Sequence, residues 1–424
     1  MAITQLSRRI VFVIAMAVFG AIAAPAAAQP AAVTACETCH RDSRDARLAA
    51  PAHDFAGSDV HRDRGFTCVS CHGGNPNEPD KVKAKGPATG FRGKPAGQAV
   101  IAVCASCHSD GALMRKFAPK QRIDQAVEYA TSIHGQRLAK GDTKVATCIN
   151  CHGAHGVRLV SDAKAPVYAL NVATTCGKCH SDGGHMKGYK LPDGSALPTD
   201  QRAKYERSVH HEAMVKRSDL SAPTCNDCHG NHGAAPPGVG AIANVCGTCH
   251  TVFATKFALS AHSQIFDRSC VECHSNHEIA KPSDAMLGTD KAALCANCHG
   301  DGDNGFKAAA SMRGDIDKLT AAIGRSETIV AKAENAGMEM GDQLLALREA
   351  ANQLTLARTE MHAFDPVPVK TVLEAGLAIT AKVEADGEAA LAEVSFRRTG
   401  LAISLGAILL VVVALRLKIR SLKH

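Results

Sequence analysis

The chain has 424 residues, a formal charge of +7 at pH 7, 18 cysteines, 4 tyrosines and no tryptophan. All 18 cysteines belong to nine copies of the pattern Cys-x-x-Cys-His. This usage excludes structural disulfides and a cysteine nucleophile, because no cysteine remains outside the pattern.

Residues 1–28 have the composition of a secretory signal peptide. Arg8 and Arg9 precede an apolar run that ends in an Ala-x-Ala cleavage pattern at Ala28. We therefore predict cleavage after Ala28 and export from the bacterial cytoplasm, because covalent haem attachment and exposed thiol chemistry belong outside it. An uncleaved N-terminal anchor is the alternative.

The nine motifs lie in residues 29–311 and predict covalent haem attachment. Two thiols three residues apart reach the two vinyl groups of one porphyrin, and the adjacent imidazole binds the iron as its proximal ligand. Zinc ribbons and dithiol redox sites also use Cys-x-x-Cys, but neither needs a histidine after the second cysteine. We predict nine covalently bound c-type haems. The cysteines are Cys36, Cys39, Cys68, Cys71, Cys104, Cys107, Cys148, Cys151, Cys176, Cys179, Cys225, Cys228, Cys246, Cys249, Cys270, Cys273, Cys295 and Cys298, and the proximal histidines are His40, His72, His108, His152, His180, His229, His250, His274 and His299.

The haem region contains four imperfect repeats. A full copy reads Ser-x-His, then Cys-x-x-Cys-His-x-x-His, and then a second Cys-x-x-Cys-His. Three copies follow this order and begin at Ser132, Ser208 and Ser260. In the first copy His61 precedes the motifs, but Asn75 occupies the position of the third histidine. The motif at Cys36 stands outside the repeats.

Twelve histidines outside the motifs are available as sixth, distal ligands of the nine irons. Those in the three full copies are our first choice: His134, His155, His210, His232, His262 and His277. For the other three haems we predict His53, His61 and His185, with His362 as a competitor. We expect His211 and His424 to face solvent. Ligation by Met114 or Met186 is an alternative, disfavoured because methionine does not recur with the repeat.

This supply of histidines bears on mechanism. An iron with two protein ligands cannot bind substrate without losing one of them, so such haems relay electrons. The third histidine missing from the first copy leaves room for one open iron among the first three haems. The relay interpretation predicts no catalytic residue.

Two segments resemble the Cys-x-x-Cys-His-Gly-x-His unit of the multihaem cytochrome c superfamily: Cys148-Ile-Asn-Cys-His-Gly-Ala-His155 and Cys225-Asn-Asp-Cys-His-Gly-Asn-His232. Ser-Ile-His134 and Ser-Val-His210 resemble the distal-ligand segments of that group. The superfamily includes small periplasmic tetrahaem cytochromes, membrane-anchored electron-transfer cytochromes, and nitrite and hydroxylamine enzymes. The resemblance implies a haem-packed domain that carries electrons.

We predict a mostly α-helical and irregular fold, with short helices packed on haem and few or no strands. Without haem this region should be largely disordered, because its compact state depends on the cofactor. Residues 29–311 have a formal charge of +5, which the two propionates of each haem reverse. Lysine and arginine are therefore expected to pair with propionates, and no nucleic acid is expected as a partner.

Residues 312–398 contain no cysteine and predict a helical hairpin or stalk, because apolar residues recur there at helical spacing. Pro366 and Pro368 divide it. We expect one helix over residues 315–362 and a second from Val369 into the membrane.

Residues 399–419 predict a transmembrane anchor, because an apolar run is flanked on both sides by arginine and lysine. A helix buried in a partner subunit is the alternative. The basic tail, residues 420–424, is expected on the cytoplasmic side, with the haems outside.

Together these features predict a cytochrome on the periplasmic side of the bacterial inner membrane. It would relay electrons between an integral-membrane redox complex, contacted by the C-terminal helices, and soluble periplasmic or outer carriers. The alternative is a terminal reductase or oxidase of a small inorganic compound such as nitrite or hydroxylamine, with one open haem. A structural unit of an outer-surface conduit is disfavoured by the cytoplasmic tail.

Overall fold

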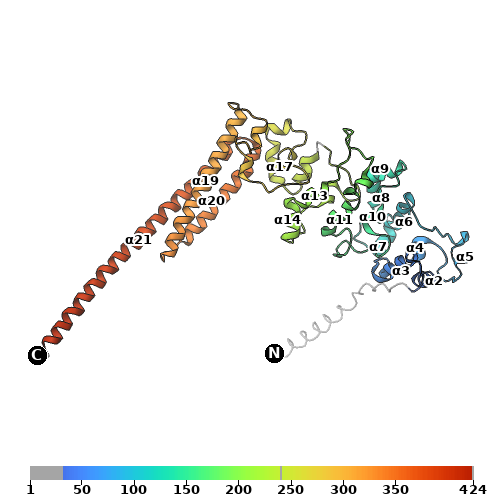
Figure 1. Ribbon diagram of the computed structural model, residues 1–424, viewed down its shortest axis with the longest axis horizontal. Helices are drawn as coiled ribbons and strands as arrows, with labels where there is room; N and C mark the ends of the chain where they lie inside the picture. The colour runs from blue at the N-terminus through green and yellow to red at the C-terminus, as the bar shows by residue number, and fades with distance from the viewer. Residues whose placement is uncertain (1–31, 239–240, 423–424) are drawn as a thin grey trace, which may run out of the picture. The chain divides into compact units, whose positions relative to one another are not determined.

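The computed structural model describes residues 32–238 and 241–422 (Figure 1). The predicted signal peptide and His424 lie outside the described residues. The chain forms two compact units. The first comprises the residues up to Arg202 together with Ala213–Pro236, and the second comprises Ala203–Glu212 and the residues from Pro237 onward.

The described residues are mostly helical, as the sequence predicted, with short helices and irregular segments before residue 304 and long helices after it. Within them we find one isolated bridge, between Lys190 and Ala196, and no strand. The helices in chain order are α2 (Ala35–Arg41), α3 (Ala46–Ser58), η1 (Arg62–Arg64), α4 (Cys68–His72), α5 (Lys81–Ala84), η2 (Pro87–Thr89), α6 (Gln98–His108), α7 (Gly111–Phe117), α8 (Gln125–Thr131), α9 (Ile133–Ala139), α10 (Cys148–His152), α11 (Ala169–His180), α12 (Gly183–Met186), α13 (Gln201–Glu206), α14 (Val209–Lys216), α15 (Cys225–His229), α16 (Ile242–Gly247), α17 (Thr251–Ala258), η4 (Ala261–Gln264), α18 (Val271–His274), η5 (Asp284–Met286), η6 (Cys295–Asn297), α19 (Asn304–Asn335), α20 (Gly341–Glu360), η7 (Met361–Ala363) and α21 (Pro366–Ser421).

The helices α4, α10 and α15 each consist of one haem motif, and their neighbours in sequence set both ends. A threonine precedes the first cysteine, and its backbone N–H donates to the side chain three residues later; for Thr147 and Asn150 Oδ1 the distance is 2.7 Å. A glycine follows the histidine at positive φ, +84° at Gly153. Glycine adopts that conformation without steric cost and ends the helix. The motif is therefore a self-contained helical turn.

Three long helices form the C-terminal region. Figure 1 shows α19, α20 and α21 side by side, with the last part of α21 extending beyond the other two. The single helix predicted over residues 315–362 was wrong, because α19 ends at Asn335 and α20 begins at Gly341. Gly337 lies between them with φ +90°, which terminates α19. The predicted break at Pro366 is confirmed: Pro366 begins α21, where a missing N–H is harmless.

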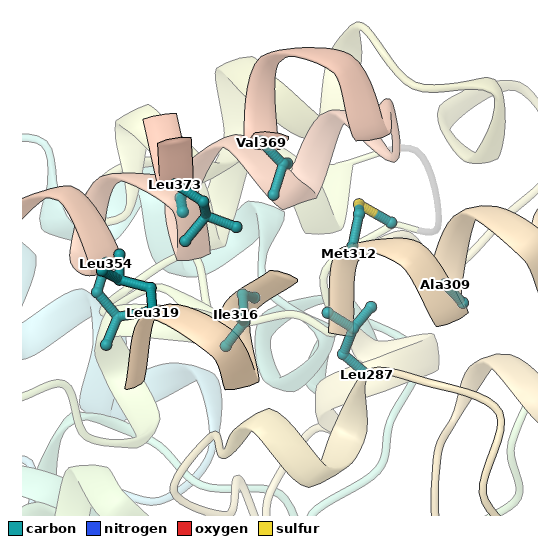
Figure 2. Packing of buried hydrophobic residues seen from close by; sticks show 9 residues of the cluster. Leu287, Ala309, Met312, Ile316, Leu319, Leu354, Val369 and Leu373 are labelled. Carbon is teal, nitrogen blue, oxygen red and sulfur yellow. The ribbon is translucent and has the colours of Figure 1, made fainter. Parts of the chain in front are cut away.

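An apolar seam between these helices forms the main core of the second unit. Figure 2 shows Met312, Ile316 and Leu319 of α19 near Val369 and Leu373 of α21. Burial of one such side chain stabilises the fold by about 1.5–3 kcal/mol. A second cluster continues the seam with Val330, Ala333, Met340, Leu347 and Val383.

Helices α19 and α21 approach closely because α21 carries glycine at the contacts. A Cβ atom added to Gly376 would lie 2.6 Å from Cδ2 of Leu319, and one added to Gly387 would lie 2.3 Å from Cγ2 of Ile329. Between them the buried Ser326 hydroxyl donates to the carbonyl oxygen of Thr380 at 3.3 Å. Larger side chains at the two glycines would force the helices apart.

The segment before the last haem motif packs on these helices. Arg358 of α20 donates to both carboxylate oxygens of Asp284, at 2.9 and 2.7 Å. Arg313 of α19 donates to the carbonyl oxygens of Asp284 and Leu287, at 2.8 and 3.3 Å. Leu287 belongs to the apolar seam. The compositional change near residue 311 is therefore not a boundary between compact units.

The last part of α21 is apolar and exposed. Its most apolar 18-residue window has a mean hydropathy of 2.4, and no part of that window is buried within the chain. In the described chain it is the one helix long and apolar enough to cross a membrane. By length and composition alone, α21 supports the predicted membrane anchor.

Candidate haem sites

Each motif places its two thiols and its imidazole close together. In α4, α10 and α15 the first cysteine begins the helix and the histidine ends it, whereas in α6 and α11 the motif is the last turn of a longer helix. Side chains three and four positions apart share one face of a helix. The two sulfurs and the ring can therefore reach the same porphyrin.

Several motif histidines bond the protein through Nδ1, which leaves Nε2 for a metal. Nδ1 of His72 lies 2.7 Å from the carbonyl oxygen of Gly93, and Nδ1 of His299 lies 3.3 Å from Oδ1 of Asp303. Hydrogen bonds of this kind fix the tautomer and orientation of metal-binding imidazoles. Gly305 gives His299 its space, since a Cβ there would lie 2.2 Å from the ring.

Along the described residues, motif histidines repeatedly face a histidine from outside the motifs. The ring centroids of each pair are 5.9 to 6.3 Å apart. The pairs are His72 with His155 at 6.0 Å, His108 with His61 at 6.1 Å, His152 with His232 at 6.1 Å, His180 with His134 at 6.1 Å, His250 with His210 at 6.3 Å, His274 with His362 at 6.3 Å, and His299 with His262 at 5.9 Å.

This spacing fits a haem iron between the rings. A metal–imidazole bond is about 2.0–2.1 Å long, so two imidazoles on opposite sides of one metal have centroids roughly 6 Å apart. Burial lowers the pKa of His134, His152, His180, His210 and His274, among others. Burial thus favours the neutral imidazole, which is the form that binds metals.

The pairs follow two rules of the repeat. The histidine of each Ser-x-His element faces the second motif of its own copy, as His134 faces His180. In the second and third copies the third histidine faces the first motif of the preceding copy, as His155 faces His72 and His232 faces His152. The first three copies are therefore interlocked by their ligands.

The serine of Ser-x-His is a buried helix cap. Ser132, which is 0% exposed, accepts a hydrogen bond from the N–H of Gly135 at 2.9 Å and starts α9. The histidine two residues later is thereby held in the first turn of the helix. Ser208 and Ser260 are likewise buried.

The first copy is less degenerate than its sequence suggests, because Asp59 takes the place of the serine. Asp59 is 1% exposed and accepts hydrogen bonds from the N–H and Nδ1 of His61 and from the N–H of Val157, each at 2.9 Å. Burial opposes ionisation of Asp59, but these hydrogen bonds outweigh it and lower its pKa. Sequence reasoning missed this residue, although aspartate and serine are equivalent as helix caps.

A recurring backbone hydrogen bond joins the two kinds of ligand segment. The donor is the N–H of the residue directly before His61, His134 or His210. The acceptor is the carbonyl oxygen two residues after the histidine that ends a Cys-x-x-Cys-His-x-x-His unit. The bonds are Val60 to Val157 at 2.9 Å, Ile133 to Ala234 at 3.1 Å, and Val209 to Ile279 at 2.9 Å.

His362 comes from the C-terminal helices, for which the sequence predicted mainly a packing role. It lies in η7 directly after α20, and its Nδ1 is 3.1 Å from the carbonyl oxygen of Arg358. Its ring packs against Phe253 at 5.0 Å, and it faces His274 with nearly parallel planes. The three-helix region therefore contributes a candidate ligand.

Three predicted ligands are not in these ring pairs. His53 is an exposed residue of α3. His185 lies in α12, and its carbonyl oxygen accepts from Nζ of Lys144 at 2.7 Å. His277 lies after α18, and its N–H donates to Oδ1 of Asn276 at 2.7 Å. A ligand role for each stays a prediction.

The structure also places the other residues considered as ligands, together with the motif histidine His229. His211 packs against Tyr205 at 5.3 Å, and its Nδ1 is 3.1 Å from the carbonyl oxygen of Glu206. Met114 and Met186 are buried in α7 and α12. The motif histidine His229 has its Nδ1 3.3 Å from the carbonyl oxygen of Ala235.

Successive motifs lie next to each other within each unit. The thiols of Cys104 and Cys148 share a hydrogen bond, as do those of Cys176 and Cys225 and of Cys246 and Cys270. These bonds lower the pKa of Cys148, Cys225 and Cys270 to about 7 in the haem-free chain. Porphyrins attached at paired motifs would be neighbours.

Repeated haem-attachment motifs, paired imidazoles and a fold of short helices define a multihaem c-type cytochrome, and the chain is one. Such a protein transfers electrons. The family described as "Doubled CXXCH motif" matches residues 262–304. The chain is also similar to proteins named "C-type polyheme cytochrome OmcB" from two strains of Geobacter sulfurreducens, with 27% identity over 214 residues to each. The match covers 46% of this chain and 25% of the length of each relative. No solved structure matches the chain.

Proposed function

We propose that the chain is a nonahaem cytochrome anchored in the bacterial inner membrane, which relays electrons on the periplasmic side. The seven facing imidazole pairs carry the proposal. An iron held between two imidazoles has no free position for substrate, which suits electron transfer and opposes catalysis.

The count of nine rests on the motifs. Every motif is complete, and each has both thiols and an imidazole within five residues. Bound haem supplies a one-electron iron couple, while the chain supplies position and surroundings. Buried caps such as Ser132 and Asp59 hold the distal imidazoles, and bonds at Nδ1 hold proximal ones such as His72.

The thiol contacts support an electron path that follows the sequence. Adjacent motifs in one unit bring their attachment sites together, as Cys104 and Cys148 do. In the haem-free chain, burial raises the pKa of the Cys151 and Cys273 thiols, and the nearby thiols of Cys179 and Cys295 in the next motifs contribute to this rise. The relay would therefore pass from motif to neighbouring motif.

The anchor and the partners are inferred from α21. Its apolar side chains beyond Arg398 are exposed to solvent over a stretch long enough to cross a bilayer. Basic residues from Arg416 onward suit the cytoplasmic side. We place an integral-membrane redox complex beside these helices and soluble periplasmic or outer carriers at the haem segments.

One observation favours the alternative, a reductase or oxidase of a small inorganic compound. The ring of His40, in the first motif, is not in the seven pairs described above. A haem there with an exchangeable sixth ligand would be the place for substrate.

Two measurements on the oxidised full-length holoprotein test the relay. Pyridine haemochrome absorbance against protein mass should give nine haems per chain. Electron paramagnetic resonance should show low-spin ferric haem alone, unchanged by nitrite or hydroxylamine. A high-spin haem that responds to either compound would favour the enzyme.

Membrane fractionation tests the anchor. The full chain should sediment with inner membranes and resist salt extraction, and a chain ending at Arg398 should be released with its haem spectrum unchanged. Release of the full chain by salt would contradict the anchor.

A further inference from the structure

The first motif differs from the seven paired motifs in what lies next to its imidazole. Nε2 of His40 lies 3.3 Å from Nζ of Lys85. In the seven pairs a second imidazole faces the motif histidine, whereas here the neighbour is an amine. We propose that Lys85 is the sixth ligand of the haem attached at Cys36 and Cys39; this rests on the proposal that the first motif carries haem.

The register of the repeat shows which position would supply a histidine to the first motif. His155 and His232 each lie seven residues after the first cysteine of their motif, and each faces the first motif of the preceding copy. Asn75 lies at that position after Cys68. Its side chain accepts the N–H of Asn77 at 3.1 Å and stays within its own turn.

The segment after Asn75 places Lys85 against the first motif. The N–H of Ala35, at the start of α2, donates to the carbonyl oxygen of Pro76 at 2.9 Å. The N–H of Asn75 donates to the carbonyl oxygen of Ala84 at 2.9 Å, which closes a loop whose last residue, Ala84, is buried. Lys85 follows at the end of α5. The loop thus bridges the second motif and the first.

The geometry suits an amine ligand after a small adjustment. Two metal–nitrogen bonds of about 2 Å on opposite sides of one metal need roughly 4 Å between the nitrogens. The observed 3.3 Å is shorter, and the flexible four-carbon stem of lysine can supply the difference by rotation. Nζ of Lys85 lies 5.5 Å from the centroid of the Phe91 ring in the haem-free chain. On binding iron the amine would release its proton to solvent, because only the neutral form can ligate.

A lysine ligand makes the first haem distinct in function. Axial ligand identity is a main determinant of haem potential, so this haem would differ in potential from those between two imidazoles. It would stand at the N-terminal end of the motif series, where a relay needs a point of exchange with a partner. The bond to Lys85 would also close the site that the enzyme alternative needs.

The test compares axial ligands in the full-length holoprotein. Near-infrared magnetic circular dichroism of the wild type should show one histidine–amine haem beside the bis-histidine haems. Lys85→Arg keeps a long side chain that can reach Phe91, but arginine stays protonated and cannot ligate as the neutral lysine amine does. It should convert one haem per chain to high spin, and added imidazole should return it to low spin. Lys85→His should keep every haem low-spin and replace the histidine–amine band.

Controls separate ligation from other effects. Lys83→Arg, on the same short helix, should leave all spectra unchanged. His53→Ala tests His53 as the rival ligand of the first haem and should leave the histidine–amine band in place. Unchanged low-spin haem in Lys85→Arg, or loss of the histidine–amine band in His53→Ala, would overturn the inference. A high-spin haem in the wild type would also overturn it. Mass spectrometry of the peptide that contains Cys36 and Cys39 separates the two proposals: absence of haem there refutes both, whereas haem with two imidazole ligands refutes the lysine alone.

Discussion

The segments before residue 304 and the three helices after it are stabilised by different interactions. Among the largest fully buried side chains, those of the three helices are mostly apolar, for example Ile316, Leu319 and Leu373. Those of the haem-bearing segments are polar: Glu37, Asp59, Ser132 and Ser208. The helices thus carry their own core, whereas the haem-bearing segments bury the groups that position ligands and leave the apolar core to porphyrin.

Removal of haem should have the largest effect, and the two regions should respond to it differently. A chain produced without haem attachment should lose the fold of residues 32–300, because the cofactor is part of the packing there. Residues 304–395 should keep their helices. Hydrogen exchange followed by mass spectrometry measures both in one sample, with the holoprotein as reference. Strong protection of residues 68–152 without haem would contradict the account.

Truncation of the apolar seam should act on the three helices alone. Leu319→Ala should lower the free energy of unfolding of this region by about 2–5 kcal/mol, because a fully buried leucine leaves a cavity. Leu345→Ala, at a residue 67% exposed, is the matched control and should stay within about 0.5 kcal/mol of the parent. Denaturant titration followed by far-ultraviolet circular dichroism gives the difference. Equal effects of the two variants would exclude the seam as the core.

His362 tests the connection between the two regions. His362→Ala should convert one ferric haem per chain from low to high spin, because the ring that faces His274 is lost. His211→Ala is the control, since His211 packs against Tyr205. Electron paramagnetic resonance distinguishes the two. An unchanged number of low-spin haems in His362→Ala would mean that the helices provide packing but no ligand.

The smallest effect is expected where the helices meet the haem-bearing segment of the same unit. Arg358→Lys keeps the charge but loses the two parallel hydrogen bonds to Asp284. Because the pair is partly exposed, the cost should be about 0.2–1 kcal/mol. Lys370→Ala, which removes an exposed ion pair with Glu374, should cost less. Thermal unfolding of the two variants and the parent gives the order.

The fold was predictable where the signal is local. Threonine before the motif and glycine after it mark α4, α10 and α15, and Pro366 marks the start of α21. The break between α19 and α20 was not predictable from glycine alone. Gly324 lies inside α19 without interrupting it, whereas Gly337 ends the same helix. The two residues have the same helix propensity, so packing around them decides.

The candidate sites were likewise predictable only in part. Sequence reasoning proposed the pool of distal histidines from their recurrence, but it gave no partners. It ranked His362 as a competitor and did not consider Asp59 or Lys85. These residues act through long-range contacts, such as those of His362 with His274 and of Lys85 with His40. No local pattern encodes such contacts.

The sequence by itself was enough to predict where haem attaches, because Cys-x-x-Cys-His fits within one helical turn and needs no distant residue. It also determined the apolar end of α21, which follows from composition. Only the tertiary structure decided which ring faces which motif, how the copies interlock, and that an amine stands opposite His40. The physical reason is that a sixth ligand must approach from the far side of the porphyrin, so it comes from a segment that folding alone brings there.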